Sequence, residues 1–199
     1  MLADVSFTQL LTAVALAIAL AACAGLRALL PIVLTGAAAR AGFIDIGPRF
    51  HFLSTNWALL LFGIATVIEI AGDKIPALDH ALDVLHTFLR PLSGSMLAAA
   101  VLSAVSDPST AIALGIIVGA PTALVPHAAR SAARLVSTVT TGGLANPILS
   151  VLEDVAAFAL FVLAVLVPLV VAGFVLLVTL LVLRRLLSRR ARTATTATA

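Results

Sequence analysis

Residues 10–39 read LLTAVALAIALAACAGLRALLPIVLTGAAA, and Arg27 is the single charged side chain in this run. A helix over the whole run would be about 45 Å long. The hydrocarbon core of a bilayer is only about 30 Å thick. Gly25, Arg27 and Pro31 interrupt the pattern near its middle. The run therefore predicts a membrane helix that is broken or strongly tilted.

The composition extends this prediction to the whole chain. Hydrophobic residues make up 62% and charged residues 11% of the 199 residues, and the mean hydropathy is +1.20. A soluble domain has about a quarter charged residues. The apolar blocks are continuous and rich in Ala, Leu and Val, which indicates helices and not a barrel. We expect an all-α polytopic membrane bundle with about five spans, broken helices, and amphipathic helices that are interfacial or re-entrant.

The domain organisation follows from the same blocks. We expect residues 1–185 to form a single transmembrane domain and residues 186–199 to form a basic, disordered, cytoplasmic tail. Offsetting the chain by 51 residues lays 56–106 on 107–157 as a weak internal repeat, in which Asp79 meets Arg130 and Asp83 meets Arg134.

The last apolar block is followed by a run of arginines: Arg184, Arg185, Arg189, Arg190 and Arg192. Cations directly after a span are typical of a cytoplasmic end in contact with lipid headgroups. The run is short and has no interleaved aromatics, so nucleic acid is not an expected partner. Five spans with a cytoplasmic C-terminus put the N-terminus outside, and Arg40 and Arg49 inside with the tail. Membrane lipids are expected partners, and a homo-oligomer is compatible with the pattern.

A cluster of ionisable residues interrupts this apolar sequence. Glu69 and Asp73 lie one helical turn apart at the end of the apolar block 57–70. Charge near hydrocarbon is costly and usually marks a pathway, a site or an assembly contact. Two close carboxylates raise each other's proton affinity. The pair is therefore a candidate coupling site, and structural ion pairs are the alternative.

Residues 76–90 have the periodicity of an amphipathic helix that we expect to end at Pro91. Asp79, Asp83 and His86 share one face of this helix. Such a set could bind a divalent cation or relay protons. A solvated face, or salt bridges to Arg130 and Arg134 on a second amphipathic stretch at 128–139, explains the same pattern. The identity of a metal stays open.

Arg27 has apolar sequence on both sides and needs an acidic partner inside the bundle. The candidates are Glu69, Asp73, Glu153 and Asp154. A structural ion pair is the favoured interpretation, and anion binding is the alternative.

A polar segment precedes the last apolar block and comprises Thr140, Thr141, Gly142, Gly143, Asn146 and Pro147. As a broken-helix site it could hold an anion or a lipid phosphate with free backbone N–H groups. The same composition also suits an ordinary loop and helix cap. Upstream, Gly115 and Gly119 are spaced for close contact between helices.

The sequence offers little for catalysis. Gly72-Asp73 resembles half of an intramembrane aspartyl site, but no second matching motif occurs. Ser93-Gly94-Ser95 lacks the leading glycine of a rhomboid-type serine site, and P-loop, Cys/His metal and nucleophile-elbow motifs are missing. We expect no cofactor, and the sequence favours a protein that is not an enzyme.

Three groups of residues carry a resemblance to a known family. They are Gly25-Leu26-Arg27-Ala28-x2-Pro31; Glu69-x3-Asp73-Lys74-Ile75-Pro76-x2-Asp79-x3-Asp83 with Arg90-Pro91-x2-Gly94; and Ser137-Thr138-x-Thr140-Thr141-Gly142-Gly143-x2-Asn146-Pro147-x2-Ser150-x2-Glu153-Asp154. Over residues 10–185 the chain resembles small bacterial integral membrane proteins catalogued as a domain of unknown function. Ala145 stands where such proteins often carry Gly. The resemblance implies an all-helical fold in the bacterial plasma membrane, and it supplies no substrate, cofactor or reaction.

Three functions fit these observations. The first is a small transporter or channel-like protein coupled to protons or another ion, with an unknown small solute or ion as its partner. The second is a membrane scaffold or assembly factor whose charges pair with each other or with another protein. The third is a protein that binds a lipid headgroup through Arg27, Arg130 and the Gly142-Gly143 segment.

Overall fold

The structure is a computed structural model. It describes residues 6–74, 76–168, 170, 173–174, 176–181 and 184–185, and of these it describes all side chains except those of 76–83. Within this part of the chain every regular element is helical. The predicted all-α fold is therefore confirmed. The predicted tail, 186–199, lies outside the described residues, and the internal repeat stays a prediction.

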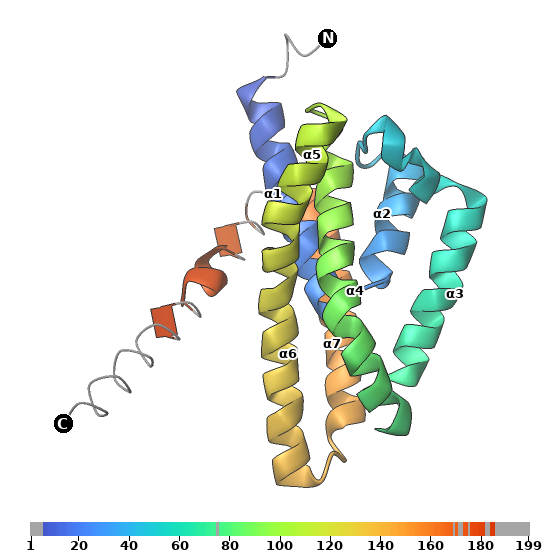
Figure 1. The fold of residues 1–199 in the computed structure, drawn as a ribbon, viewed down its shortest axis with the longest axis vertical. Helices are drawn as coiled ribbons and strands as arrows, with labels where there is room; N and C mark the ends of the chain where they lie inside the picture. Colours follow the sequence, from blue (N-terminus) through green and yellow to red (C-terminus); the bar gives the residue numbers. More distant parts are fainter. Residues whose placement is uncertain are drawn as a thin grey trace, which may run out of the picture.

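The elements follow one another as a series of helices (Figure 1). They are α1 (Phe7–Leu26), α2 (Leu30–Arg40), the 3-10 helix η1 (Pro48–Ser54), α3 (Asn56–Gly72), α4 (Pro76–Leu102), α5 (Pro108–Leu114), the π-helix η2 (Gly115–Gly119), α6 (Ala120–Thr141) and α7 (Asn146–Leu166). Four described segments are long and apolar enough to cross a bilayer: Phe7–Leu26, Val84–Leu102, Pro108–Thr141 and Asn146–Leu166. The pair η1 and α3, bent by 63°, adds a fifth if it counts as one span. The chain is thus a multi-pass membrane protein.

The apolar run at 10–39 is broken, as its sequence predicts, but it also reverses direction. α1 ends at Leu26, and α2 runs back alongside the bundle (Figure 1). With 11 residues, α2 is only about 16 Å long, too short to cross a bilayer. Thr8 of α1, Asp45 after α2 and Val105 after α4 line one cavity at the same end of the bundle.

This reversal corrects the predicted orientation. We expected the run to cross once and to put Arg40 opposite the N-terminus. Because α1 and α2 form a hairpin, α2 instead ends toward the end of the bundle where α1 begins, and Asp45, which follows α2, lines a cavity there with Thr8.

Two prolines lie inside helices, and at one of them, Pro91, we expected the helix to end. α4 continues through Pro91 to Leu102, and α6 continues through Pro126 to Thr141. Proline removes one backbone donor and crowds the carbonyl four residues earlier, which usually breaks a helix in water. Membrane helices tolerate it because side chains and neighbouring helices satisfy the freed groups. One turn after Pro91, the hydroxyl of Ser95 donates to the Pro91 carbonyl at 2.8 Å.

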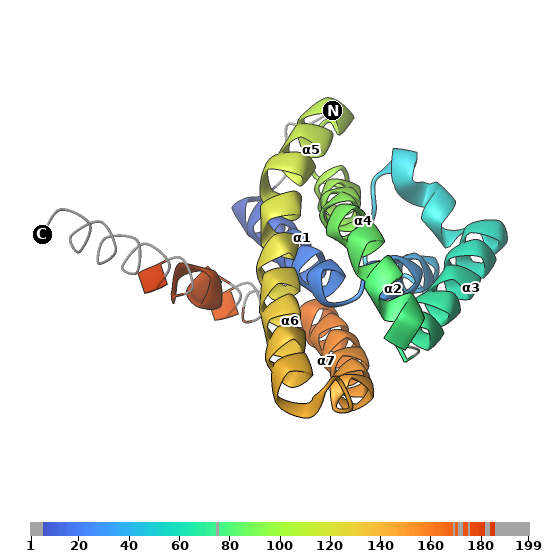
Figure 2. The same ribbon diagram turned by 60° about the horizontal axis from the view of Figure 1, so that its bottom comes forward.

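Small residues bring the central helices together. α1 lies against α4, α6 and α7, and its alanines between Ala15 and Ala24 are buried (Figures 1 and 2). The predicted close contact at Gly115 and Gly119 is confirmed. A Cβ placed on Gly119 would lie 2.4 Å from the carbonyl oxygen of Gly94 in α4, and one on Gly115 would lie 2.6 Å from that of Ser95. These distances leave no room for a side chain between α4 and η2.

This contact predicts a sharp difference between two glycines. Gly119→Ala forces a methyl group into the α4 backbone and should lower the free energy of unfolding by about 1–3 kcal/mol. Gly63→Ala in α3 is the matched control, because a Cβ there meets no described atom within 4 Å. That control should leave stability unchanged or raise it by about 0.5–1 kcal/mol. Thermal unfolding in detergent measures both, and equal effects of the two substitutions would contradict the packing described here.

Candidate functional site

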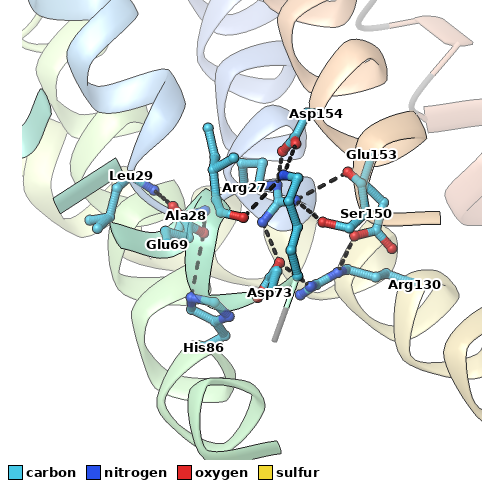
Figure 3. Close-up of polar contacts among 12 residues, drawn as sticks. Arg27, Ala28, Leu29, Glu69, Asp73, His86, Arg130, Ser150, Glu153 and Asp154 are labelled. Atoms are coloured by element: carbon cyan, nitrogen blue, oxygen red, sulfur yellow. Dashed lines mark hydrogen bonds and ion pairs between the residues drawn. The ribbon is translucent and has the colours of Figure 1, made fainter. Parts of the chain in front are cut away.

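The break between α1 and α2 places Arg27 in the middle of the bundle. Arg27 follows the last residue of α1 in an extended conformation, with φ −134° and ψ 123°, and its side chain is fully buried. Figure 3 shows this side chain surrounded by polar groups from α3, α6 and α7. A buried guanidinium needs counter-charges and hydrogen-bond acceptors, because its desolvation otherwise costs several kcal/mol. The rest of the site supplies them.

Arg27 has acceptors on two other helices. Its Nη1 atom donates to Asp73 Oδ2 at the end of α3. Its Nη2 atom donates to the hydroxyl and the carbonyl oxygen of Ser150 in α7, at 2.9 and 3.1 Å. Its Nε atom lies 2.6 Å from Asp154 Oδ1, which is ion-pair distance although the two groups are not aligned as a hydrogen bond. Arg27 thus joins α3 to α7.

Asp73 is the point where the guanidinium groups converge. Its Oδ2 atom contacts Arg27, lies 2.6 Å from Arg130 Nη2 and lies 3.5 Å from Arg134 Nη2. Its Oδ1 atom is buried and has no hydrogen-bond partner among the described residues. One carboxylate oxygen therefore holds cations from the α1–α2 break and from α6.

The remaining charges close the network on α7. Glu153 Oε2 lies 2.6 Å from Arg130 Nε and 3.2 Å from Arg134 Nη2. Lys74 Nζ lies 3.3 Å from Asp154 Oδ2, and this pair is the more exposed rim of the network. Arg130 and Arg134 are four residues apart and so lie on one face of α6. We call the connected set of Arg27, Asp73, Lys74, Arg130, Arg134, Ser150, Glu153 and Asp154 the Asp73 network.

Glu69 makes a separate set of contacts one turn before Asp73. Its two carboxylate oxygens accept hydrogen bonds from the backbone N–H groups of Ala28, at 2.9 Å, and Leu29, at 3.0 Å. Amides at the start of a helix have no acceptor within their own helix. The Glu69 carboxylate, which is buried, therefore caps α2 from another helix (Figure 3).

A chain of imidazole and guanidinium groups continues from Glu69 along α4. His86 Nε2 lies 3.5 Å from Glu69 Oε1. The fully buried Arg90 lies with Nη2 3.4 Å from His86 Nδ1, and its Nη1 atom contacts Nδ1 of His127 in α6. Arginine only donates, so both Nδ1 atoms act as acceptors. A neutral His86 then carries its hydrogen on Nε2, the atom that faces Glu69.

The structure brings together most of the residues that the sequence singled out. Two of the four acids expected near Arg27, Asp73 and Asp154, lie at ion-pair distance from it, and Glu69 instead binds the backbone beside it. Arg130 and Arg134 contact Asp73 and Glu153. The proposed partners on α4, Asp79 and Asp83, have side chains outside the described residues.

The polar segment after α6 lies apart from these charges. Gly142 and Gly143 adopt left-handed conformations, with φ +63° and +87°, in the tight turn between α6 and α7. Thr140 and Thr141 are exposed at the end of α6, and Asn146 and Pro147 begin α7. Gly142 follows Arg130 by twelve residues, about 18 Å along a helix. Arg130 and the glycines are therefore well separated along the chain, and a headgroup site shared by Arg27, Arg130 and the glycines stays a prediction.

The residues predicted for the site did not include Ser150, His127, Lys74, Arg90 or the backbone of Ala28 and Leu29. Ser150 precedes Glu153 and Asp154 by three and four residues, and His127 precedes Arg130 by three, so both share a helix face with a predicted residue. That spacing is a signal by which they could have been found. The backbone N–H groups of Ala28 and Leu29 carry no side-chain signal at all.

The fold and this network define a class: a multi-pass helical membrane protein with a buried, largely self-paired charge cluster. Residues 14–189 match the model of the family described as "Domain of unknown function (DUF4126)", and the chain belongs to this family. The resemblance seen in the sequence is thereby confirmed. No curated protein and no solved structure was found to match the chain.

Proposed function

We propose that this protein is a small ion-coupled transporter or channel-like protein of the bacterial plasma membrane, with its C-terminal tail in the cytoplasm. The carboxylates of Glu69 and Asp73 carry the coupling charge, and Arg130 and Arg134 act as the gate. One observation carries the proposal: a single oxygen of Asp73 lies at ion-pair distance from three guanidinium groups, one at the α1–α2 break and two on α6.

This arrangement makes the charge state of Asp73 matter to several helices at once. Neutralising Asp73, by a proton or a bound cation, removes the attraction that holds the α1–α2 break and α6 to the end of α3. Like-charged guanidinium groups would then repel each other in a poorly screened interior. Buried charge pairs that have two arrangements are suited to gating, because the binding of an ion selects between them.

The broken first hairpin supports the same proposal. Discontinuous helices with charged groups at the break are recurrent sites for substrates and ions in transporters. α2 is such a half-length helix, and Arg27 stands at its break. Asp79, Asp83 and His86 remain candidates for the route of the ion. The polar turn Thr140 to Pro147 has no direct part in it.

The proposal predicts ion flux that depends on two carboxylates. Purified protein in proteoliposomes should carry a pH-dependent flux of protons, Na⁺, K⁺ or Cl⁻, measured with ion-sensitive dyes. Glu69→Gln and Asp73→Asn remove the coupling charge and should abolish that flux. Asp45→Asn is the control, because Asp45 is exposed and lies at the opposite end of the bundle.

If vesicles with the wild-type protein show no more flux of any of these ions than protein-free vesicles, the transport proposal is contradicted. The scaffold function would then be favoured, since charges that neutralise each other also hold a bundle together. A scaffold should co-purify with a stable partner protein after extraction in mild detergent.

A cavity of about 470 Å³ favours a second candidate, the binding of an anionic lipid. Its wall is formed by the spans α1, α6 and α7 together with Phe174 and Val178, and it is apolar except near Arg130, Glu153 and Thr179. An acyl chain suits the apolar wall, and Arg130 suits a phosphate. In this cavity Arg130 would contact the headgroup, and Gly142 and Gly143 would take no part.

This second candidate predicts that filling the cavity displaces lipid. Ala133 lines the cavity, whereas its neighbour Ala132, also exposed on α6, does not. Ala133→Phe should lower the amount of anionic phospholipid that native mass spectrometry detects on the purified protein, and Ala132→Phe should not. Equal retention by both variants, or no preference for anionic over zwitterionic lipid, would exclude a specific lipid site in this cavity.

A further inference from the structure

We infer that the coupling ion is the proton, and that its binding to Glu69, next to His86, releases the start of α2. This inference rests on the proposed function and names the ion for the same site. It adds a defined movement: the backbone just after Arg27 keeps both of its hydrogen bonds to Glu69 only while Glu69 is a carboxylate.

The ligands around Glu69 favour a proton over a metal ion. Both oxygens of Glu69 already face N–H donors or the Nε2 atom of His86. Na⁺ or a divalent cation needs several oxygen ligands at about 2–2.6 Å. A proton needs only one of the two oxygens.

The cap on α2 depends on the charge of that carboxylate. α2 has no side-chain cap of its own at Leu29 within the described structure. Its first N–H groups carry the positive end of the helix dipole, which a carboxylate stabilises. When one carboxylate oxygen binds a proton from the solvent, it becomes an O–H donor and no longer accepts well from a backbone N–H group. One cap hydrogen bond is then lost, and so is the negative charge that stabilised the helix start. No other bond forms or breaks.

The charged groups around Glu69 determine the pH at which it binds a proton. Arg27 lies at the break itself, Asp73 lies one turn further on α3, and His86 faces Glu69 from α4 with Arg90 behind it. The side chains of 76–83 lie outside the described residues. His86 Nε2 lies 3.5 Å from Glu69 Oε1, and an N–H group facing a carboxylate at this position favours its charged form. Removing the imidazole should therefore let Glu69 take up its proton at higher pH.

Release of α2 links Glu69 to the Asp73 network. Ala28 and Leu29 follow Arg27 directly, so a change in their backbone contacts also moves the residue that binds Asp73 and Ser150. Proton binding at Glu69 can thereby loosen the guanidinium cluster without protonating Asp73. Glu69 serves as the proton site in this account, and Asp73 as the contact through which the bundle responds.

Hydrogen–deuterium exchange in lipid nanodiscs tests this directly, using peptides that span residues 26–36. After correction for intrinsic exchange, wild-type protection at Ala28 and Leu29 should fall at least about tenfold as the pH is lowered from 9 to 5. Glu69→Gln should show low protection at every pH. His86→Phe should shift the loss of protection to higher pH, and Asp45→Asn should follow the wild type.

Wild-type protection that does not change with pH would overturn the inference, and this outcome needs no variant to fold. An unchanged midpoint in His86→Phe would remove the role of His86. Ion flux that persists alongside pH-independent protection would overturn the proton site alone. Protection that falls with pH in a protein without flux would support the proton site and remove only its use in transport.

Discussion

The contact between Arg27 and Asp73 is the interaction on which the rest of this structure depends. A guanidinium that is buried at a helix break loses its hydration, so opposite charges and hydrogen-bond acceptors of the protein must compensate. Asp73 neutralises it from α3, and Ser150 and Asp154 complete its coordination from α7. Because Arg130 and Arg134 share the same carboxylate, α6 is held to this point as well. The buried Arg27 guanidinium, whose desolvation is unfavourable, therefore links α3, α6 and α7 through its contacts and those of Asp73.

Two acids at the end of α3 contact different groups. Glu69 faces the backbone of the α1–α2 break, and Asp73 faces the side chains of Arg27 and Arg130. They are four residues apart, so any movement of this turn affects both sets of contacts. A charge change at either acid is thereby transmitted to the hairpin α1–α2, which is the half-length, discontinuous part of the fold. That coupling is the physical basis of the function proposed here.

Much of the fold could be predicted from the sequence, because apolar blocks and small-residue spacing act locally. The helical spans and the Gly119 contact belong to this group. The reversal after Arg27 could not be predicted, since Gly25 and Pro31 signal a break but not the direction that follows it. The continuation of α4 through Pro91 depends on neighbouring groups. The cap at Ala28 was hidden for another reason: its donors are backbone atoms, which leave no mark in the sequence.

A double-mutant cycle between Arg27 and Asp73 tests the central claim most directly. Unfolding free energies would be measured in the same lipid–detergent mixture for Arg27→Gln, Asp73→Asn and the double variant. Each single change should cost about 3–5 kcal/mol, because it removes one of the opposite charges that neutralise a buried group. The double variant should lose clearly less than the sum, with a coupling energy of about 1–3 kcal/mol. Additive losses, or single changes that cost less than about 0.5 kcal/mol as at an ordinary surface site, would contradict the account.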